Sequence, residues 1–94
     1  MAISRINDFY AAAGREQALR AFLESVLAII KGAAGCQDVE LLVDQENPAH
    51  LVILERWDSV AAHQDAARLI PQSKLAEVGP LLAEPPRGRY YDPA

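Results

Sequence analysis

Residues 36–57, CQDVELLVDQENPAHLVILERW, decide the fold of this chain. Two apolar runs, Cys36–Asp44 and His50–Trp57, flank a short segment in which Asn47 and Pro48 are typical of a turn. We therefore predict a β-hairpin. Both runs contain consecutive apolar residues, so apolar side chains point to both faces of the sheet, whereas a sheet with one solvated face alternates apolar and polar residues. The sequence thus predicts that something covers each face.

The residues before the hairpin predict a strand and a long helix. From Ile3 to Ala11 the side chains alternate between two faces, with Asn7 and Phe9 on the same face. Gly14 ends this strand. The segment Arg15–Lys31 then carries apolar residues at helical spacing, namely Leu19, Phe22, Leu23, Val26, Leu27 and Ile30.

The residues after the hairpin predict a second helix and a last strand. Asp58 and Ser59 are typical helix caps, and the helix is expected from about Val60 to Leu69. A further helical turn is expected at Ser73–Val78. The segment Arg87–Tyr91, which follows two prolines, is predicted to be a short strand.

The order strand, helix, strand, strand, helix, strand is that of the split βαβ, ferredoxin-like fold. This α+β fold has a four-stranded antiparallel sheet with both helices on one face. A single domain accounts for residues 1–94. The other face of the sheet is left bare, and its apolar residues predict a homodimer packed sheet against sheet, because an exposed patch of this size favours aggregation.

Composition excludes several classes of protein. Hydrophobic residues make up 51% of the chain and charged residues 23%, which is typical of a globular domain. Nine basic residues stand against 13 acidic ones and form no basic stripe, so we expect no nucleic-acid partner. The longest nearly uncharged stretch, Ser25–Ile30, is far too short to cross a bilayer, and the N-terminus lacks a secretory signal. We therefore expect no membrane association and a cytoplasmic location.

The sequence contains no recognisable metal site or disulfide. Cys36 is the only cysteine and lies far along the chain from the histidines His50 and His63, so neither an internal disulfide nor a zinc pattern is predicted. We interpret Cys36 as a small buried residue at the start of a strand rather than a reactive thiol.

Four features together resemble the antibiotic biosynthesis monooxygenase (ABM) family of dimeric α/β barrels. They are the strand-then-glycine start Phe9–Gly14, the Gly35-Cys36 opening of the second strand, the run Glu55–Ser59 that leads into the second helix, and His63 on that helix. The resemblance implies the ferredoxin-like fold, a homodimer, and oxygenation of electron-rich aromatics without flavin, haem or metal. It therefore implies no cofactor, and a quinol, polyphenol or polyketide-type aromatic as the substrate with dioxygen.

The chemistry implied by this resemblance makes three demands on the protein. A phenol or enol, once deprotonated, can reduce dioxygen by one electron, after which the radical pair recombines. The site must therefore bind an apolar ring, favour the substrate anion with a donor or a base, and exclude water.

Three residues are candidates for this catalytic work. Asn7 can donate from its amide to an oxyanion or to dioxygen. Its position relative to Gly14 is similar to that of the catalytic asparagine of haem-degrading members. The alternative is an edge-strand asparagine bonded to water or backbone. Trp57, which walls the cavity in the family, can donate to a substrate oxygen or serve only as core. His63, on the inward stripe of its helix, can accept the substrate proton or fill an interfacial or capping role.

Other residues receive supporting roles. The predicted substrate-binding residues are Phe9, Phe22, Leu23 and Val60, which can also simply pack the core. The last strand carries Arg87, Arg89, Tyr90 and Tyr91, for which a dimer contact is favoured over closure of the cavity or binding of an acidic substrate group. We expect His50 at the surface and Glu55, if buried, in an ion pair with Arg5. In haem-degrading relatives the iron-binding histidine stands roughly where this chain has Ala67, which argues against haem as substrate.

Two hypotheses about function follow. The first is a cofactor-independent monooxygenase that uses Asn7 and Trp57 as donors and His63 as proton acceptor. The second is a non-catalytic dimeric module that uses the same cavity to bind a small aromatic ligand or a protein partner. A dry apolar pocket that contains all three side chains would favour the enzyme, and a collapsed core would favour the module.

Overall fold

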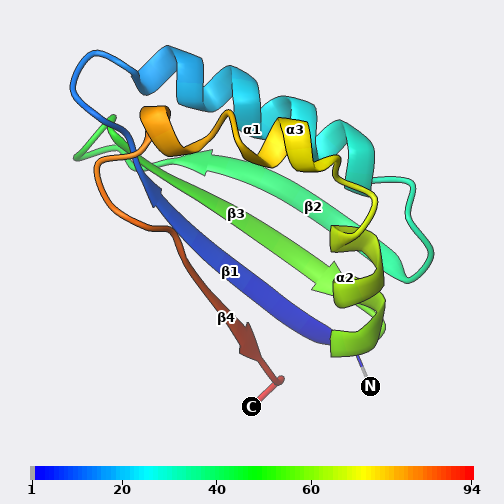
Figure 1. Ribbon diagram of the computed structural model, residues 1–94. Helices are drawn as coiled ribbons and strands as arrows, with labels where there is room; N and C mark the ends of the chain where they lie inside the picture. Colours follow the sequence, from blue (N-terminus) through cyan, green and yellow to red (C-terminus); the bar gives the residue numbers. More distant parts are fainter. Residues whose placement is uncertain (1) are drawn as a thin grey trace.

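The computed structural model describes residues 2–94 and contains a four-stranded antiparallel sheet with its helices on one face (Figure 1). The elements in chain order are β1 (Ile3–Tyr10), α1 (Glu16–Ile30), β2 (Cys36–Val43), β3 (His50–Trp57), α2 (Val60–Ala67), α3 (Gln72–Leu75), the short 3-10 helix η1 (Gly79–Leu81) and β4 (Arg87–Tyr91). The strand order is β2-β3-β1-β4. This arrangement confirms the predicted ferredoxin-like α+β fold.

Strand β1 lies in the interior of the sheet, between β3 and β4. Asn7 stands opposite Ile53 of β3 and opposite Gly88 of β4. The alternative interpretation of Asn7 as an edge-strand residue is therefore wrong, because both edges of β1 are paired. Since successive side chains of a strand point to opposite faces, Arg5, Asn7 and Phe9 all face the helices.

The hydrophobic core fills the layer between the sheet and the helices. Helix α1 buries five apolar side chains spaced along one stripe, namely Leu19, Phe22, Leu23, Val26 and Ile30. A first cluster joins most of this stripe to Phe9, Leu51 and Ile53. A second cluster surrounds Trp57 at the end where Ile30 and Ala66 of α2 meet the sheet. Cys36 is half-buried against this second cluster, and burial raises the pKa of its thiol.

The start of β2 approaches α2 closely, and a glycine makes this approach possible. Gly35 has φ +83, and a Cβ at this position would lie 2.6 Å from the Cβ of Ala62. A larger residue would therefore be strained and would also push α2 away. Helix α2 itself begins as predicted, because the Ser59 side chain accepts a hydrogen bond from the backbone N–H of Ala62.

The opposite face of the sheet carries no helix of residues 2–94 (Figure 1). Leu42 and Leu54 on this face are 41% and 37% exposed, while Val52 is half-buried between neighbouring strands. The prediction of apolar side chains on both faces is thus confirmed. No helix among residues 2–94 is long and apolar enough to cross a membrane.

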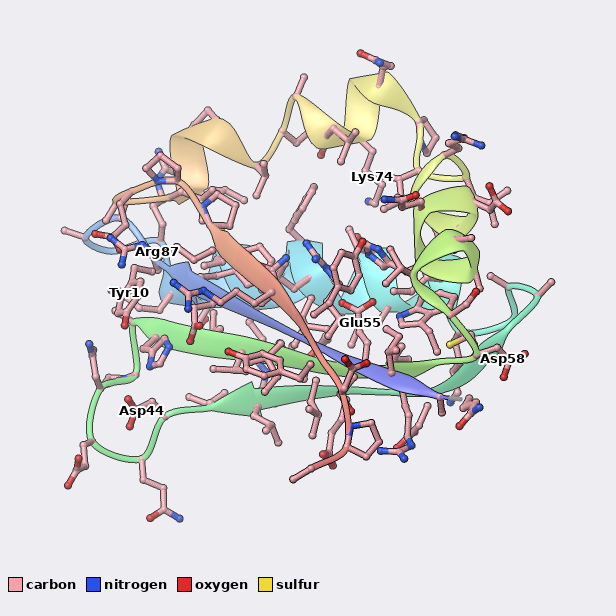
Figure 2. All side chains as sticks on the ribbon, turned by 90° about the horizontal axis from the view of Figure 1, so that it is seen from below. Tyr10, Asp44, Glu55, Asp58, Lys74 and Arg87 are labelled. Carbon is pink, nitrogen blue, oxygen red and sulfur yellow. The ribbon has the colours of Figure 1, made fainter. Side chains whose placement is uncertain are left out.

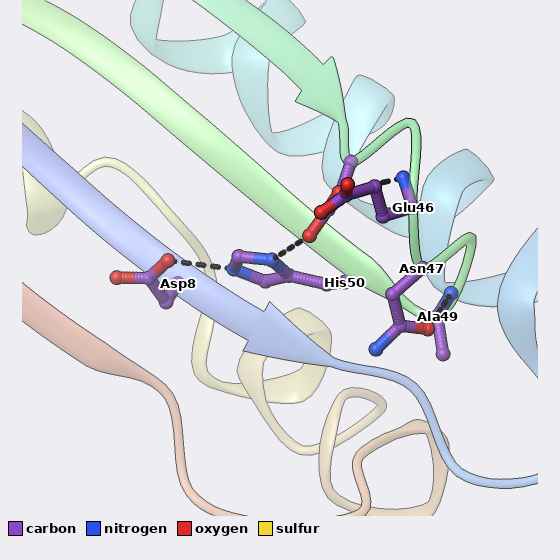
Figure 3. A network of polar contacts seen from close by, with 6 residues as sticks. Asp8, Glu46, Asn47, Ala49 and His50 are labelled. Atoms are coloured by element: carbon purple, nitrogen blue, oxygen red, sulfur yellow. Dashed lines mark hydrogen bonds and ion pairs between the residues drawn. The ribbon is translucent and has the colours of Figure 1, made fainter.

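His50 lies on the same bare face, but its ring is enclosed rather than at the surface as predicted. Its Nδ1 lies 2.9 Å from Asp44 Oδ2, and its Nε2 lies 2.7 Å from Asp8 Oδ1 (Figure 3). The ring also stacks on Tyr10 with centroids 4.4 Å apart, and only 17% of the side chain is exposed. Hydrogen bonds to Asp44 and Asp8 raise the pKa of His50. The surface prediction failed because Asp8, 42 positions away in sequence, and Asp44 of the same hairpin both contact the ring.

The Leu19→Ala substitution should destabilise the fold strongly. Leu19 lies on the buried face of α1 and is fully buried. Its truncation removes apolar contacts and leaves a cavity, so the free energy of unfolding should fall by about 2–5 kcal/mol. Urea denaturation followed by circular dichroism measures this loss. Leu69→Ala, at a side chain that is 56% exposed, serves as the control and should change stability by less than about 0.5 kcal/mol. Equal losses in the two variants would contradict the assigned core.

Candidate active site

A cavity of about 280 Å³ lies between the sheet and the helices. Apolar side chains of β1, β3 and α1 form one part of its wall, and Ile70, Leu75 and Pro86 close it from the segment that links α2 to β4. Three of the four predicted substrate-binding residues, Phe9, Phe22 and Leu23, line it. The fourth, Val60, does not line it and packs in the cluster around Trp57.

A larger groove of about 520 Å³ lies between the α1–β2 connection and α2. It is shallow and open, and its lining is mostly alanine and glycine, with Asp58 and Asp65 as its acidic residues. None of the predicted catalytic or substrate-binding residues contributes to it. Because chemistry on an apolar ring requires an enclosed site, we assign the site to the smaller cavity.

Four polar side chains gather at one side of the cavity. Arg5 and Asn7 come from β1, Glu55 comes from β3, and His63 comes from α2. Arg5, Asn7 and Glu55 face the helices because of strand alternation. The side chain of His63 reaches the cavity from α2, on the helix side of the sheet. Two of the three predicted catalytic residues, Asn7 and His63, therefore share one space.

The amide oxygen of Asn7 is buried and has no hydrogen-bond partner among residues 2–94. The backbone groups of β3 and β4 next to Asn7 are used in pairing with β1. The Asn7 side chain therefore depends on hydrogen-bond partners from outside the sheet. An unsatisfied buried acceptor costs about 1–3 kcal/mol. A cavity lined by such an acceptor is suited to a ligand that supplies an O–H or N–H donor.

His63 is held by the last strand. Its Nδ1 lies 2.6 Å from the hydroxyl of Tyr90, and its ring contacts Trp57 edge-on at 5.5 Å between centroids. Burial and the positive charge of Arg5 lower the pKa of His63 to about 4. The ring is therefore neutral at neutral pH, and its second nitrogen, Nε2, lies 3.9 Å from Glu55 Oε1.

Glu55 is only 4% exposed and extends from β3 toward the helices (Figure 2). Its Oε1 accepts a hydrogen bond of 2.9 Å from the indole nitrogen of Trp57. Burial raises the pKa of Glu55, although the bond from Trp57 and the charge of Arg5 oppose this shift. The predicted ion pair with Arg5 is wrong, because no Arg5 nitrogen lies within 4.0 Å of a Glu55 oxygen.

Trp57 takes a different place from the one predicted. It is completely buried, lies outside the lining of the cavity, and gives its indole N–H to Glu55. It therefore has no free donor for a substrate oxygen. Its position behind Glu55 makes it a residue that orients this carboxyl group.

Sequence reasoning gave Arg5 and Glu55 only the role of an ion pair, and for Tyr90 it favoured a dimer contact over a role in the cavity. Arg5 and Glu55 could have been found, because they share the alternation of Asn7 and Trp57. Tyr90 could not, since its contact with His63 depends on the pairing of β4 with β1, which places Tyr90 opposite Arg5. No group of three or more His, Cys, Asp and Glu residues in the described part of the chain could hold a metal ion.

The two histidines should titrate far apart. His63 should titrate near pH 4, because burial and Arg5 disfavour its charged form, whereas His50 should titrate above its usual 6.5 because Asp44 and Asp8 stabilise its charged form. Proton NMR of the two imidazoles measures both values, and His50→Gln assigns the signals. By linkage, the stability that His63 contributes is present above pH 6.5 and is lost as the pH falls toward 4. Titration of both rings near 6.5 would contradict the assigned surroundings.

The family model of the antibiotic biosynthesis monooxygenases (ABM) matches residues 2–69 of the chain. No curated protein sequence matches it significantly. Among solved structures, Rv0793 from Mycobacterium tuberculosis is 26% identical with a TM-score of 0.87, over 100% of this chain and 96% of that chain. SO0527 from Shewanella oneidensis is 27% identical with a TM-score of 0.83, over 96% and 88%.

A third structure, of SnoaB, a cofactor-independent oxygenase from Streptomyces nogalater, has a TM-score of 0.83 over 98% of this chain and 92% of that chain. At 13% identity this likeness concerns the fold alone. The family match covers most of the chain, from β1 through α2, and includes Asn7, Glu55 and His63. The chain therefore belongs to the antibiotic biosynthesis monooxygenase family.

Proposed function

We propose that this protein is a cofactor-independent monooxygenase that oxidises a quinol or a polyphenolic, polyketide-type aromatic with dioxygen. The observation that carries the proposal is the buried, unpartnered Oδ1 of Asn7, which lines a mostly apolar cavity beside a neutral histidine. Membership of the family supports it, as does the fold shared with SnoaB, a cofactor-independent oxygenase. An apolar chamber with a few convergent polar groups is typical of a small-molecule site.

In this proposal His63 accepts the substrate proton. When its Nδ1–H donates to the hydroxyl oxygen of Tyr90, Nε2 carries the lone pair and is free to take a proton from a substrate hydroxyl. Glu55, 3.9 Å from Nε2, then stabilises the imidazolium that forms. The indole N–H of Trp57 keeps Glu55 in place, so Trp57 acts as a positioning residue.

The substrate anion supplies the electrons. It transfers one electron to dioxygen, and the resulting radical and superoxide combine into a peroxide on a ring carbon that bears hydrogen. The peroxide takes the proton back from His63, and cleavage of its O–O bond with loss of that hydrogen releases water and leaves a carbonyl group on the ring. Asn7 holds the substrate oxygens through its amide, and the apolar wall formed by Phe9, Phe22 and Leu23 binds the ring and excludes water.

We further propose that all 94 residues form one ABM domain and that it works as a homodimer in the cytoplasm. Leu42 and Leu54, exposed on the bare face of the sheet, favour packing against a second copy. Charged residues on this face, such as Asp8 and Arg87, stand opposite each other across strands, which suits a self-complementary contact. A cytoplasmic location agrees with a single cysteine, Cys36, that forms no internal disulfide.

A second candidate function is a non-catalytic dimeric module that binds a small ligand. The low pKa of His63 favours it, because a base with a pKa of about 4 takes a proton from a phenol only at a considerable cost in free energy. The module would use Asn7 and Arg5 for recognition alone. Oxygen consumption separates the two functions.

Removal of Asn7 or His63 should abolish oxygen uptake. With reduced quinols and polyphenols in an oxygen electrode under metal-chelating conditions, we expect Asn7→Ala and His63→Ala to lower the rate by about 100-fold or more, because each removes a group that acts on the reacting oxygen. Gln64→Ala, exposed on the same helix as His63, is the matched control and should retain the wild-type rate. Wild-type protein that binds quinols without consuming oxygen would establish the module instead.

Disruption of the bare face should produce monomers. Leu54→Glu places a charge in the centre of the proposed sheet-to-sheet contact, so sedimentation equilibrium at micromolar concentration should show a dimer for the wild type and a monomer for the variant. Leu69→Glu, at an exposed position outside the sheet, should remain dimeric. A monomeric wild-type protein would contradict the proposed assembly.

A further inference from the structure

Arg5 places a positive charge on the wall of the cavity without a carboxylate partner among residues 2–94. Its guanidinium carbon lies 4.9 Å from the centre of the Tyr90 ring, a cation–π contact that leaves its N–H donors free. The charge acts inside the site. It contributes, after burial, to the lowered pKa of His63, and it opposes the rise that burial causes in the pKa of Glu55. A half-buried guanidinium in such surroundings is suited to an anionic ligand group.

The position of this guanidinium depends on Gly88. A Cβ at Gly88 would lie 2.7 Å from the Cζ of Arg5 and closer still to one of its terminal nitrogens, so the guanidinium occupies the space that a side chain at position 88 would fill. Gly88 is the strand partner of Asn7. Arg5 therefore reaches along the sheet to the level of Asn7, which brings a cationic donor and an unpartnered acceptor to the same side of the cavity.

We propose that the ligand of this cavity is a hydroxylated aromatic carboxylate, whose carboxylate binds Arg5 and whose ring hydroxyl, not adjacent to the carboxylate, donates to Oδ1 of Asn7. The planar guanidinium offers parallel N–H donors that match a carboxylate, and the carboxylate arrives ionised at neutral pH without any proton transfer. The ligand lies with its ring against the apolar wall.

The size of the cavity limits the ring system. At about 280 Å³ it lies near the lower end of the range for small-molecule sites, about 300–1,000 Å³. A space of this volume is suited to one ring or two fused rings, the smaller members of the proposed substrate class. This inference builds on the proposed monooxygenase by naming the substrate class of its site, but the binding step can be tested separately from oxidation.

Calorimetric binding without dioxygen tests the site. The probes are 4-hydroxy-2-naphthoate, which carries both groups, 1-naphthol, which lacks the carboxylate, and 2-naphthoate, which lacks the hydroxyl. We expect the hydroxynaphthoate to bind about tenfold or more tightly than either, because each missing group leaves a cavity residue unsatisfied. Equal affinity for hydroxynaphthoate and naphthol in the wild type would overturn the proposal.

Two variants that act in different ways identify Arg5 as the source of the preference. Arg5→Met removes the charge and keeps the length of the side chain, while Gly88→Ala keeps the charge and displaces the guanidinium. Both should abolish the advantage of hydroxynaphthoate over naphthol, and Arg68→Met, at a side chain that is 78% exposed, should preserve it. Asn7→Ala should abolish the advantage of the hydroxynaphthoate over 2-naphthoate. A preference for the carboxylate that survives in folded Arg5→Met and Gly88→Ala proteins would refute the assignment.

Oxygen uptake separates this inference from the proposed function. Dihydroxynaphthalene and its carboxylate derivative are quinols that differ only in the group assigned to Arg5. Oxygen uptake with both quinols at equal kcat/KM would retain the monooxygenase and reject the carboxylate site. Selective binding of hydroxynaphthoate without any oxygen uptake would retain the site and reject the monooxygenase.

Discussion

The pairing of β1 on both sides is the constraint on which the rest of this structure depends. Because β3 and β4 hydrogen-bond to its two edges, β1 cannot slip by one residue without turning its entire core face to the outside. The fixed register sends Phe9 into the core and Arg5 and Asn7 to the cavity wall. The same register sends Ile6 and Asp8 to the bare face, so one strand serves both the site and the proposed dimer contact.

The polar side of the cavity opposes the stability of the fold. Glu55 and the amide oxygen of Asn7 are buried, and removing these polar groups from water costs free energy that apolar residues would not cost. The fold offsets this cost only in part, through the hydrogen bond from Trp57 to Glu55 and the one between His63 and Tyr90. Departures from simple core packing are typical of functional sites. The one buried unsatisfied side-chain atom among residues 2–94, Asn7 Oδ1, and the half-buried Arg5 guanidinium are the groups that a ligand would reach.

Local patterns predicted the elements well, and contacts between distant segments accounted for the errors. The last strand was predicted at Arg87–Tyr91 and is found there, because two prolines set its start. In contrast, Trp57 was expected to line the cavity, although it shares its strand face with Glu55 and Ile53, which do. Alternation gives the face of the sheet but not the position along it, and α2 covers the end of β3 where Trp57 lies. His50 was misjudged for a related reason, since Asp8 approaches it from another strand.

The sequence by itself determined the order of the elements, the amphipathic stripe of α1, the apolar character of both sheet faces and the family, because these follow from periodicity and from residues close together in the chain. Only the tertiary structure decided the partners of the polar groups. Tyr90 contacts His63 across 27 positions of sequence, and Gly88 makes room for Arg5 only because β4 is aligned beside β1. Such contacts depend on strand register and on where α2 meets the sheet, which the packing of the whole core sets and no local pattern encodes.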